Sequence, residues 1–520
     1  MLLSLCLALL SAASLVTCRV THFPSRAVNT TGISNLIDVD LDELNAGLAA
    51  GMFTSVDLVN AYIARIMEVN STLHMVTELN PDALTIAAQA DALRANGTIL
   101  SPLHGIPILI KNNIATDDEM NNTAGSWSLL GAKVPRDSTM GAKLRKAGAI
   151  ILGKANLSQW ANYRSFNTSN GWSAYGGQTY GAYVPNQDPS GSSSGSAVSS
   201  SLGLALASLG TETSGSILSP ADVNNLVGIK PTVGLTSRYL VIPISQHQDT
   251  VGPLARYVKD AAAILQQIAG PDSRDNYTSA IPNNGTLPDY VAACNYDAFA
   301  GKRIGVASNV LDIWGKYTSP VVVTAFNEAV AQIAAAGATI VEANFTAFEN
   351  FTKSGAENVV LEADFISDLA NYFSELKTDP YGLTDLKEEQ NFTHKFPKEH
   401  WPNRDTLVWT AALKQGFNNT SPKFWSAYQT NLFFGGEGGI LGALKRTNSD
   451  AVLLPTQLSP SIPALIGSPV VSVPMGFYPA NTTVVKNDWG LVEQGPNTPF
   501  GLSFMGAKWS EADLVGFAYA

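Results

Sequence analysis

The sequence is short of charged residues, and of positive charge in particular. Charged side chains make up 14% of its 520 residues, against about 25% in typical soluble proteins. Its 32 lysines and arginines are outnumbered by 43 acidic residues, which gives a formal net charge of −11. We expect no nucleic-acid partner, because such a protein needs a basic patch to neutralise phosphates.

Cysteines and metal-binding patterns are also scarce. Only Cys6, Cys18 and Cys294 are present, and no sequence signature marks Cys294 as a nucleophile, so we expect a buried or idle thiol there. His394 and His400 lie in HKFPKEH, which lacks the spacing of zinc ligands on a helix face. The sequence predicts neither a metal site nor a cofactor.

Long apolar runs are absent apart from residues 2–16. This run is shorter than the roughly 20 residues that span a bilayer, and small residues follow it before Arg19. It predicts a secretory signal peptide over residues 1–18, followed by a loose lead-in over residues 19–36. A short buried helix is the alternative. No other segment predicts a transmembrane helix.

About fourteen N-x-Ser/Thr acceptor sites also favour export. Such sites carry sugar on the surface of secreted proteins, so we expect a secreted glycoprotein. Asn156 and Asn167 lie close to the motifs described below, so not every site can be used. Other acceptor sites include Asn29, Asn70, Asn96, Asn276, Asn284, Asn344, Asn391 and Asn481.

Hydrophobic periodicity and capping signals predict alternating helices and strands. Asp40 with Glu43, and Thr54 with Asp57, have the spacing of capping boxes before two helices. The predicted strands cover residues 106–110, 149–152, 303–306 and 338–341, and further helices cover residues 82–95, 139–147, 202–209 and 319–336. The order strand, helix, strand over residues 303–341 is a βαβ unit. We see no repeat and no linker, which favours one large α/β domain.

Residues 345–434 are rich in aromatic side chains and poor in strand signals. They predict a helical region. The ordinary interpretation is helical core, and the alternative is a cap that also lines an apolar substrate pocket.

Three segments carry possible chemistry. Lys111 ends the apolar strand in HGIPILIKNN, where burial would lower its pKa and leave a neutral amine able to accept a proton; a lysine that reaches solvent is the alternative. A Gly/Ser-rich stretch, GSSSGS, begins at Gly191 and runs into an apolar segment, which favours a tight turn over a linker. The third segment, LGTETSGSI at residues 209–217, could point several backbone N–H groups at one spot.

Together these segments resemble the amidase signature family of serine hydrolases. Further stretches resemble the family, including LVGIKPTVGL, ISQHQDTVGPLAR and LIGSPVVSVPMGF. The resemblance runs from about residue 37 to residue 518 and is thin over residues 270–450. GSSSGS and GTET are similar to the branch that includes bacterial peptide amidase. The resemblance implies one domain over residues 37–520, with a mixed β-sheet covered on both faces by helices.

The resemblance also implies roles for residues. The catalytic lysine corresponds to Lys111, the cis-bonded bridging serine to Ser192 and the nucleophile to Ser216. The turn Thr213, Ser214, Gly215 and Ser216 supplies the oxyanion-binding N–H groups, and Ser193 supports Lys111. The expected activity is hydrolysis of a linear carboxamide, from a small molecule or a peptide, through a Ser-Ser-Lys triad. The substrate and the oligomeric state stay open.

The sequence departs from the family at several positions. Leu218 stands where many members have arginine, which leaves Glu212 in need of other hydrogen-bond donors. Ser214 replaces a common aspartate, and Asn112 or Asn113 replaces another. The chain ends inside what resembles the last helix of the family, so an incomplete C-terminus is an alternative.

Two other functions are alternatives. GSSSG fits the G-x-S-x-G nucleophile elbow with Ser193 as nucleophile, but His247, His394 and His400 lie in no supporting motif. A catalytically inactive secreted glycoprotein that keeps the fold for binding is the alternative from a different class.

Overall fold

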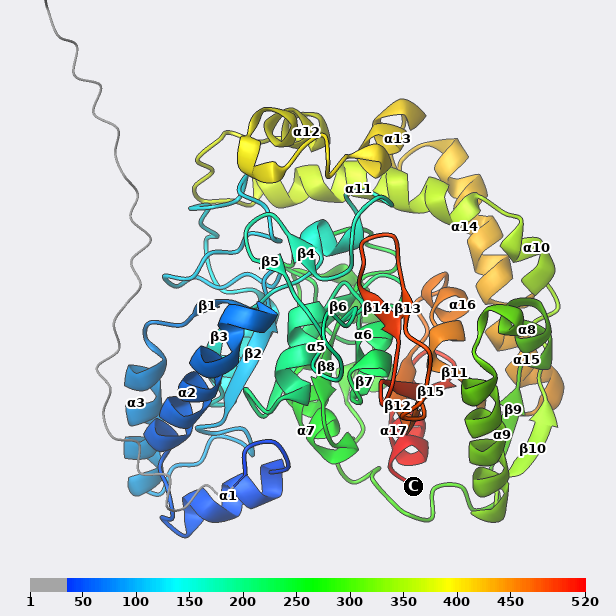
Figure 1. Ribbon diagram of the computed structural model, residues 1–520, viewed down its shortest axis with the longest axis horizontal. Coiled ribbons are helices and arrows are strands. Elements are labelled where there is room, and N and C mark those ends of the chain that lie inside the picture. Colours follow the sequence, from blue (N-terminus) through cyan, green and yellow to red (C-terminus); the bar gives the residue numbers. More distant parts are fainter. Residues whose placement is uncertain (1–34) are drawn as a thin grey trace, which may run out of the picture.

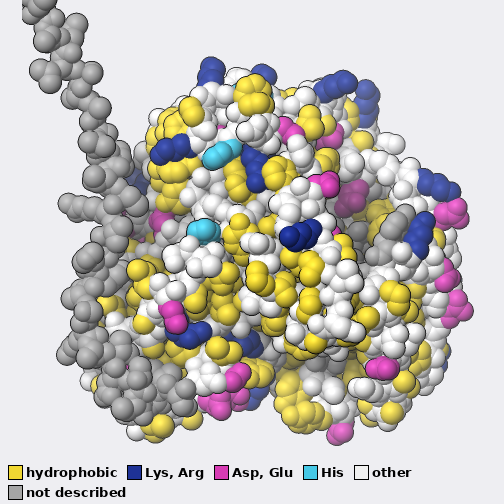
Figure 2. Space-filling view, viewed as in Figure 1, with side chains coloured by type: hydrophobic (Ala, Val, Ile, Leu, Met, Phe, Trp, Pro, Cys, Tyr) yellow, Lys and Arg dark blue, Asp and Glu magenta, His cyan; other side chains and the backbone are white. Residues whose placement is uncertain are grey.

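The computed structural model describes residues 35–520 (Figure 1). The predicted signal peptide, and the lead-in up to residue 34, lie outside the described residues. Within the described part, no helix is both long and apolar enough to cross a membrane. On the face shown in Figure 2, lysine and arginine side chains are scattered rather than gathered into one patch.

An eleven-stranded mixed sheet forms the centre of the molecule. Its order is β1-β3-β2-β6-β8-β7-β12-β15-β11-β9-β10. The strands are β1 (Val76–Leu79), β2 (Pro107–Lys111), β3 (Ile150–Ala155), β6 (Ala207–Glu212), β7 (Val227–Lys230), β8 (Thr250–Ala255), β9 (Arg303–Val306), β10 (Thr339–Glu342), β11 (Ala451–Pro455), β12 (Val470–Phe477) and β15 (Pro499–Met505). Two small sheets pair β4 (Trp172–Ser173) with β5 (Gly177–Gln178), and β13 (Val485–Lys486) with β14 (Val492–Gln494).

Helices cover both faces of this sheet, as the sequence predicts. Along β11, Ala451 and Leu453 belong to one apolar cluster, whereas Val452 and Leu454 belong to another. Because successive side chains of a strand point to opposite faces, both faces are buried. The helices are α1 (Leu41–Ala49), α2 (Ser55–Leu73), α3 (Ala83–Ala95), α4 (Thr139–Lys146), α5 (Ser194–Ser201), α6 (Leu218–Val223), α7 (Val258–Ile268), α8 (Ser308–Trp314), α9 (Pro320–Ala335), α10 (Phe348–Thr352), α11 (Ala356–Ser374), α12 (Leu386–Lys395), α13 (Leu407–Gln415), α14 (Pro422–Gly435), α15 (Ile440–Thr447), α16 (Ser461–Ala464) and α17 (Glu511–Tyr519).

Local signals place most of the predicted elements correctly. Capping boxes at Asp40 and Thr54 begin α1 and α2. The segment β9-α9-β10 is the predicted βαβ unit, with β9 and β10 parallel. Residues 345–434, all of which the structure describes, contain α10 to α14 and no strand, and Figure 1 shows α11, α12 and α13 lying across one end of the molecule.

The predicted helix over residues 202–209 is wrong. The helix here is α5, which begins at Ser194 in the serine-rich stretch, and residue 207 already begins β6. Two buried serines of this helix find acceptors: Ser200 Oγ donates to Ser196 O at 2.9 Å, and Ser196 Oγ donates to Leu209 O at 3.0 Å. The hydroxyl groups satisfied in this way let a polar segment pack against the sheet.

Candidate active site

Two parallel neighbouring strands bring the first two parts of the site to one edge of the sheet. In β2 and β6, Ile108 pairs with Ala207 and Ile110 with Leu209. Lys111 is the last residue of β2, and the turn at residues 213–217 follows the end of β6. Because parallel strands end at the same edge, Lys111 and this turn lie together.

The Gly/Ser-rich stretch supplies the third part. Its Gly191–Ser192 peptide bond is cis, and α5 begins two residues later. The Ser193 N–H donates to Ser216 O at 3.1 Å, which holds this stretch against the turn. The structure therefore brings together Lys111, Ser192, Ser193 and Ser216 from three separate segments.

Lys111 is completely buried and surrounded by oxygen atoms. Its Nζ lies 2.7 Å from Ser192 Oγ, 3.1 Å from Ser193 Oγ and 2.8 Å from Thr211 Oγ1. Burial lowers the pKa of Lys111 to about 7, although the carboxylates of Asp249 and Glu212 oppose this shift. The amine is therefore largely neutral at slightly alkaline pH and can accept a proton from a neighbouring hydroxyl group.

Two other buried lysines help to show what is specific about Lys111. Burial also lowers the pKa of Lys154 to about 7 and that of Lys230 to about 8. Lys154 Nζ donates to Ile114 O and Asn122 Oδ1, and Lys230 Nζ donates to Ser468 O. Of these three lysines, Lys111 is the one that contacts serine hydroxyl groups.

Glu212 shapes the turn that carries Ser216. Its carboxylate accepts backbone N–H bonds from Gly215 at 2.8 Å, Ile217 at 2.7 Å and Leu218 at 2.9 Å. These donors take the place of the arginine that Leu218 replaces, so Glu212 is not left unpaired. Three charge-assisted hydrogen bonds to one carboxylate fix the conformation of the turn.

The turn leaves a set of backbone donors free. Within residues 35–520, the N–H groups of Thr213, Ser214 and Ser216 have no hydrogen-bond acceptor, whereas Gly215 gives its N–H to Glu212. The oxyanion-binding set that the resemblance implies is therefore reduced by one. Gly215 has φ +85°, a left-handed conformation that glycine adopts without strain.

Ser216 is mostly buried, with 7% of its surface exposed. Among the described residues, its hydroxyl group makes no hydrogen bond. A hydroxyl group that is accessible, close to free N–H donors and held against the Ser192 segment can act as a nucleophile once a base removes its proton.

The sequence interpretation gave no role to two residues of the site. Thr211 accepts hydrogen bonds from Lys111 Nζ and, at 3.0 Å, from Asn113 Nδ2. Asp249 accepts a hydrogen bond from Thr213 Oγ1 at 2.6 Å, and burial raises the pKa of Asp249 to about 6. Both lie in stretches that resemble the family, at 209–217 and 244–256, but neither stretch by itself indicates which side chain faces the lysine.

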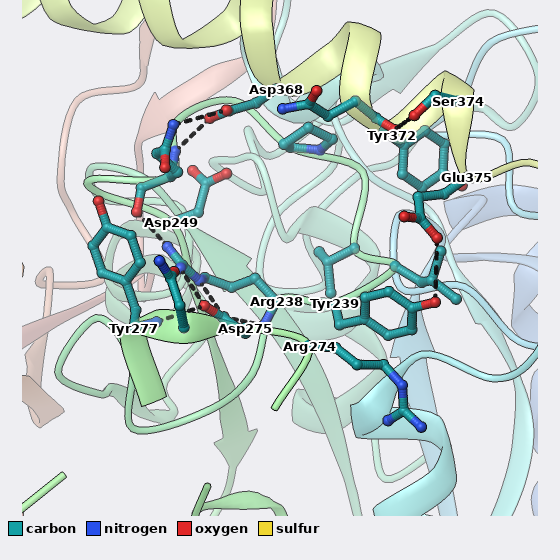
Figure 3. A pocket seen from close by; sticks show the side chains of 16 residues that line it. Arg238, Tyr239, Asp249, Arg274, Asp275, Tyr277, Asp368, Tyr372, Ser374 and Glu375 are labelled. Atoms are coloured by element: carbon teal, nitrogen blue, oxygen red, sulfur yellow. Dashed lines mark hydrogen bonds and ion pairs between the residues drawn. The ribbon is translucent and has the colours of Figure 1, made fainter. Parts of the chain in front are cut away.

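Asp249 also borders a cavity of about 370 Å³ (Figure 3). On one side of this cavity, Arg238 forms an ion pair with Asp275 at 2.7 Å. On the other, Asp368 of α11 accepts hydrogen bonds from the backbone and side chain of Gln246. These contacts fix the loop that carries Asp249, so α11 supports the turn at residues 213–217 through this loop.

The histidines do not assemble the alternative nucleophile site. Ser193 Oγ contacts Lys111 Nζ and Thr211 O. His247 instead pairs with Asp364, His394 contacts Thr406, and the His400 ring packs against Trp172. In the described part of the chain, no three histidine, cysteine or acidic residues are grouped so that they could hold a metal ion.

Comparisons with known proteins find a family model and a related sequence that match most of this chain. A family model described as Amidase matches residues 57–515. A protein of Arthroderma benhamiae that is named as an amidase is 56% identical over 510 residues, which cover 94% of this chain and 86% of that protein.

Solved structures of peptide amidase are also similar to this chain. Native peptide amidase from Stenotrophomonas maltophilia has a TM-score of 0.82 and 37% identity, over 93% of this chain and 96% of that chain. A peptide amidase in complex with the competitive inhibitor chymostatin gives the same values.

Proposed function

The chain belongs to the amidase family, and on that premise we propose that it hydrolyses a linear carboxamide through an acyl-enzyme on Ser216. The observation that carries this proposal is the 2.7 Å contact between Lys111 Nζ and Ser192 Oγ in a fully buried setting. A neutral amine at this contact has the two features of a general base: a suitable pKa and reach to a proton.

The reaction begins with proton transfer along two hydroxyl groups. Lys111 takes the proton of Ser192, and Ser192 takes the proton of Ser216. As the bond from Ser216 Oγ to the amide carbon forms, the carbonyl oxygen gains negative charge, and the free N–H groups of the turn stabilise it.

The leaving nitrogen needs a proton before it departs. The proton held by Lys111 returns through Ser192 to this nitrogen as the carbon–nitrogen bond breaks, so an amine or ammonia leaves. Water then attacks the acyl-enzyme and gives a proton through Ser192 to Lys111. This proton returns through Ser192 to Ser216 Oγ as the carboxylic acid leaves, which restores Ser216.

The substrate proposal begins from the similar structures named as peptide amidases. A peptide with a C-terminal carboxamide is therefore the first substrate to test, ahead of simple alkyl and aryl amides. The net charge of −11 favours a small molecule or peptide over a nucleic acid as partner.

Labelling of Ser216 tests the proposed reaction. A fluorophosphonate probe is expected to label the native protein, and Ser216→Ala is expected to abolish labelling together with amide hydrolysis. Ser201→Ala is the matched control, because Ser201 lies at the C-terminal end of α5 and makes no contact with Lys111. A folded native protein that neither reacts with the probe nor releases ammonia from any amide would instead support the inactive, binding alternative.

We also propose that the protein is secreted and carries sugar. The structure separates the acceptor sites by exposure: Asn156 is buried, and its Nδ2 donates to Thr179 Oγ1 at 2.9 Å, whereas Asn96, Asn391 and Asn481 are exposed. Glycopeptide mapping after expression through a secretory pathway is expected to find sugar at exposed sites and none at Asn156. Retention in the cytosol without sugar would contradict secretion.

A further inference from the structure

Asn431 in α14 is a buried carboxamide with no hydrogen-bond partner in the described residues. It is 1% exposed, and both its Nδ2 and its Oδ1 lack a partner. Nearly all buried polar groups in proteins are paired, because an unpaired donor or acceptor loses its bonds to water and gains none in return. The position therefore calls for a partner that the free chain does not supply.

Helical spacing shows which way Asn431 faces. Tyr428, Asn431 and Gly435 are separated by three and four residues, so they share one face of α14. At one end of this face, the Tyr428 ring lies 4.4 Å from the His247 ring, between centroids. At the other end, a Cβ atom on Gly435 would lie 2.7 Å from Ile466 and 2.9 Å from Ile462 O.

Two segments pack against this face, the loop with His247 and the segment around α16, and both also contact the turn that carries Ser216. The loop with His247 carries Asp249, which accepts the hydrogen bond from Thr213. Pro460, directly before α16, lies against Gly215, where an added Cβ atom would approach it to 3.6 Å.

An apolar cluster next to Ser216 also places this face of α14 near the turn. Leu218, two residues after Ser216, belongs to one cluster with Phe434 of α14 and Ile462 of α16. Asn431 thus lies on the face of α14 that is turned toward the segments flanking Ser216.

We propose that Asn431 binds the acyl part of the substrate by pairing with a peptide group, and so makes the enzyme selective for peptide amides. This inference rests on the proposed function. A carboxamide offers N–H donors and one carbonyl acceptor, which match the carbonyl and N–H of a peptide group. A fatty acyl chain offers neither, and would leave the Asn431 amide unpaired.

The setting favours a selective contact. The amide is closed to water in the free chain, and a substrate that reaches it forms its hydrogen bonds in a low-dielectric environment, where they are stronger than in water. A substrate without the peptide group gains no compensating bond with water at this position.

Two substrates and three proteins test the proposal. The substrates are an N-acetylated amino acid amide, which has one internal amide group, and an analogue in which a CH₂–CH₂ link replaces that group. The proteins are the native chain, Asn431→Leu and the control Gln429→Leu, since Gln429 is an exposed amide on the same helix. Ammonia release gives kcat/KM for each protein with each substrate.

The native chain is expected to prefer the peptide substrate by about tenfold or more. Asn431→Leu is expected to lose that preference by slowing the peptide substrate and leaving the analogue nearly unchanged, while Gln429→Leu keeps it. Equal losses on both substrates, or an unchanged preference in Asn431→Leu, would overturn the proposal.

If Asn431→Leu fails to fold, the native chain can still overturn the inference. Equal kcat/KM values for the two substrates would then overturn the inference. Failure of the proposed function would look different, because neither substrate would be hydrolysed and Ser216 would not react with a fluorophosphonate.

Discussion

At the scale of single residues, the chemistry of Lys111 comes from its surroundings. The same side chain in water has a pKa of 10.5, and burial lowers this value to about 7. Lys154 shows that burial alone is not enough, since its pKa falls equally while its Nζ contacts a backbone carbonyl and an asparagine. What distinguishes Lys111 is the serine hydroxyl group 2.7 Å away.

Glu212 is the residue we expect to hold the turn at residues 213–217 in place. In Glu212→Gln, an NH₂ group replaces one of the two oxygens and faces a backbone N–H donor, so at least one hydrogen bond is lost. We expect kcat to fall by about tenfold or more and the free energy of unfolding to fall by about 1–3 kcal/mol.

Ammonia release and urea unfolding measure the two effects of Glu212→Gln. Glu437→Gln is the control, because Glu437 is exposed on the surface with its carboxylate 3.7 Å from Arg446. If Glu212→Gln matched the native chain in both measurements, Glu212 would have no part in shaping the turn.

At the scale of elements, the site depends on close packing between α5 and β6. Gly210 in β6 faces the serine segment, and a Cβ atom there would lie 2.7 Å from Ser193 Oγ and 2.7 Å from Leu254 Cδ1. Contacts this short force a neighbour to move. Ser193 is the neighbour that also contacts Lys111, so packing and catalysis are linked at this point.

Gly210→Ala should therefore impair catalysis more than folding. The new methyl group displaces Ser193 and with it the Lys111 amine, and we expect kcat/KM to fall by about tenfold or more. Gly355→Ala is the control, since no atom lies within 4 Å of a Cβ atom at Gly355. Circular dichroism shows whether the fold is kept, and full activity in a folded Gly210→Ala protein would contradict this account of the packing.

Elements with local signals could be predicted from the sequence, whereas those decided by tertiary contacts could not. Asp40 and Thr54 cap their helices through residues three positions away, so the signal is contained in one short segment. The serine-rich α5 depends on an acceptor in β6. Because this contact is not visible in the sequence, the sequence predicts a helix over residues 202–209 instead of residues 194–201.

The same contrast applies to the site. The resemblance supplied Lys111, Ser192 and Ser216, and the structure brings their three segments together. Thr211 contacts Lys111 across 100 residues, and Asp249 contacts Thr213 across 36. Such pairings arise from the folding of the sheet and its loops, and no spacing within one segment indicates them.

At the scale of the whole molecule, several buried lysines affect stability. Burial lowers the pKa of Lys111 and Lys154 to about 7, and that of Lys230 to about 8. In the unfolded chain these lysines bind protons up to about pH 10.5. Between these limits the unfolded state holds more protons than the folded state, so the free energy of unfolding rises with pH.

We therefore expect urea unfolding to show higher stability at pH 9 than at pH 8. Each fully shifted lysine contributes about 1.4 kcal/mol per pH unit in this range. Lys154→Met removes one contribution and should reduce the slope by about 1 kcal/mol per pH unit. A slope that is zero, or one that Lys154→Met leaves unchanged, would contradict the depressed lysine pKa values.

The pH dependence of kcat/KM for a peptide amide tests the central claim most directly. If neutral Lys111 is the base, kcat/KM rises with pH through a pKa near 7 and levels off above it. Lys154→Met should keep this profile, because Lys154 makes no contact with the serines, whereas Lys111→Met should abolish activity. A rate that falls between pH 6 and pH 8, or an active Lys111→Met protein, would show that another group removes the proton.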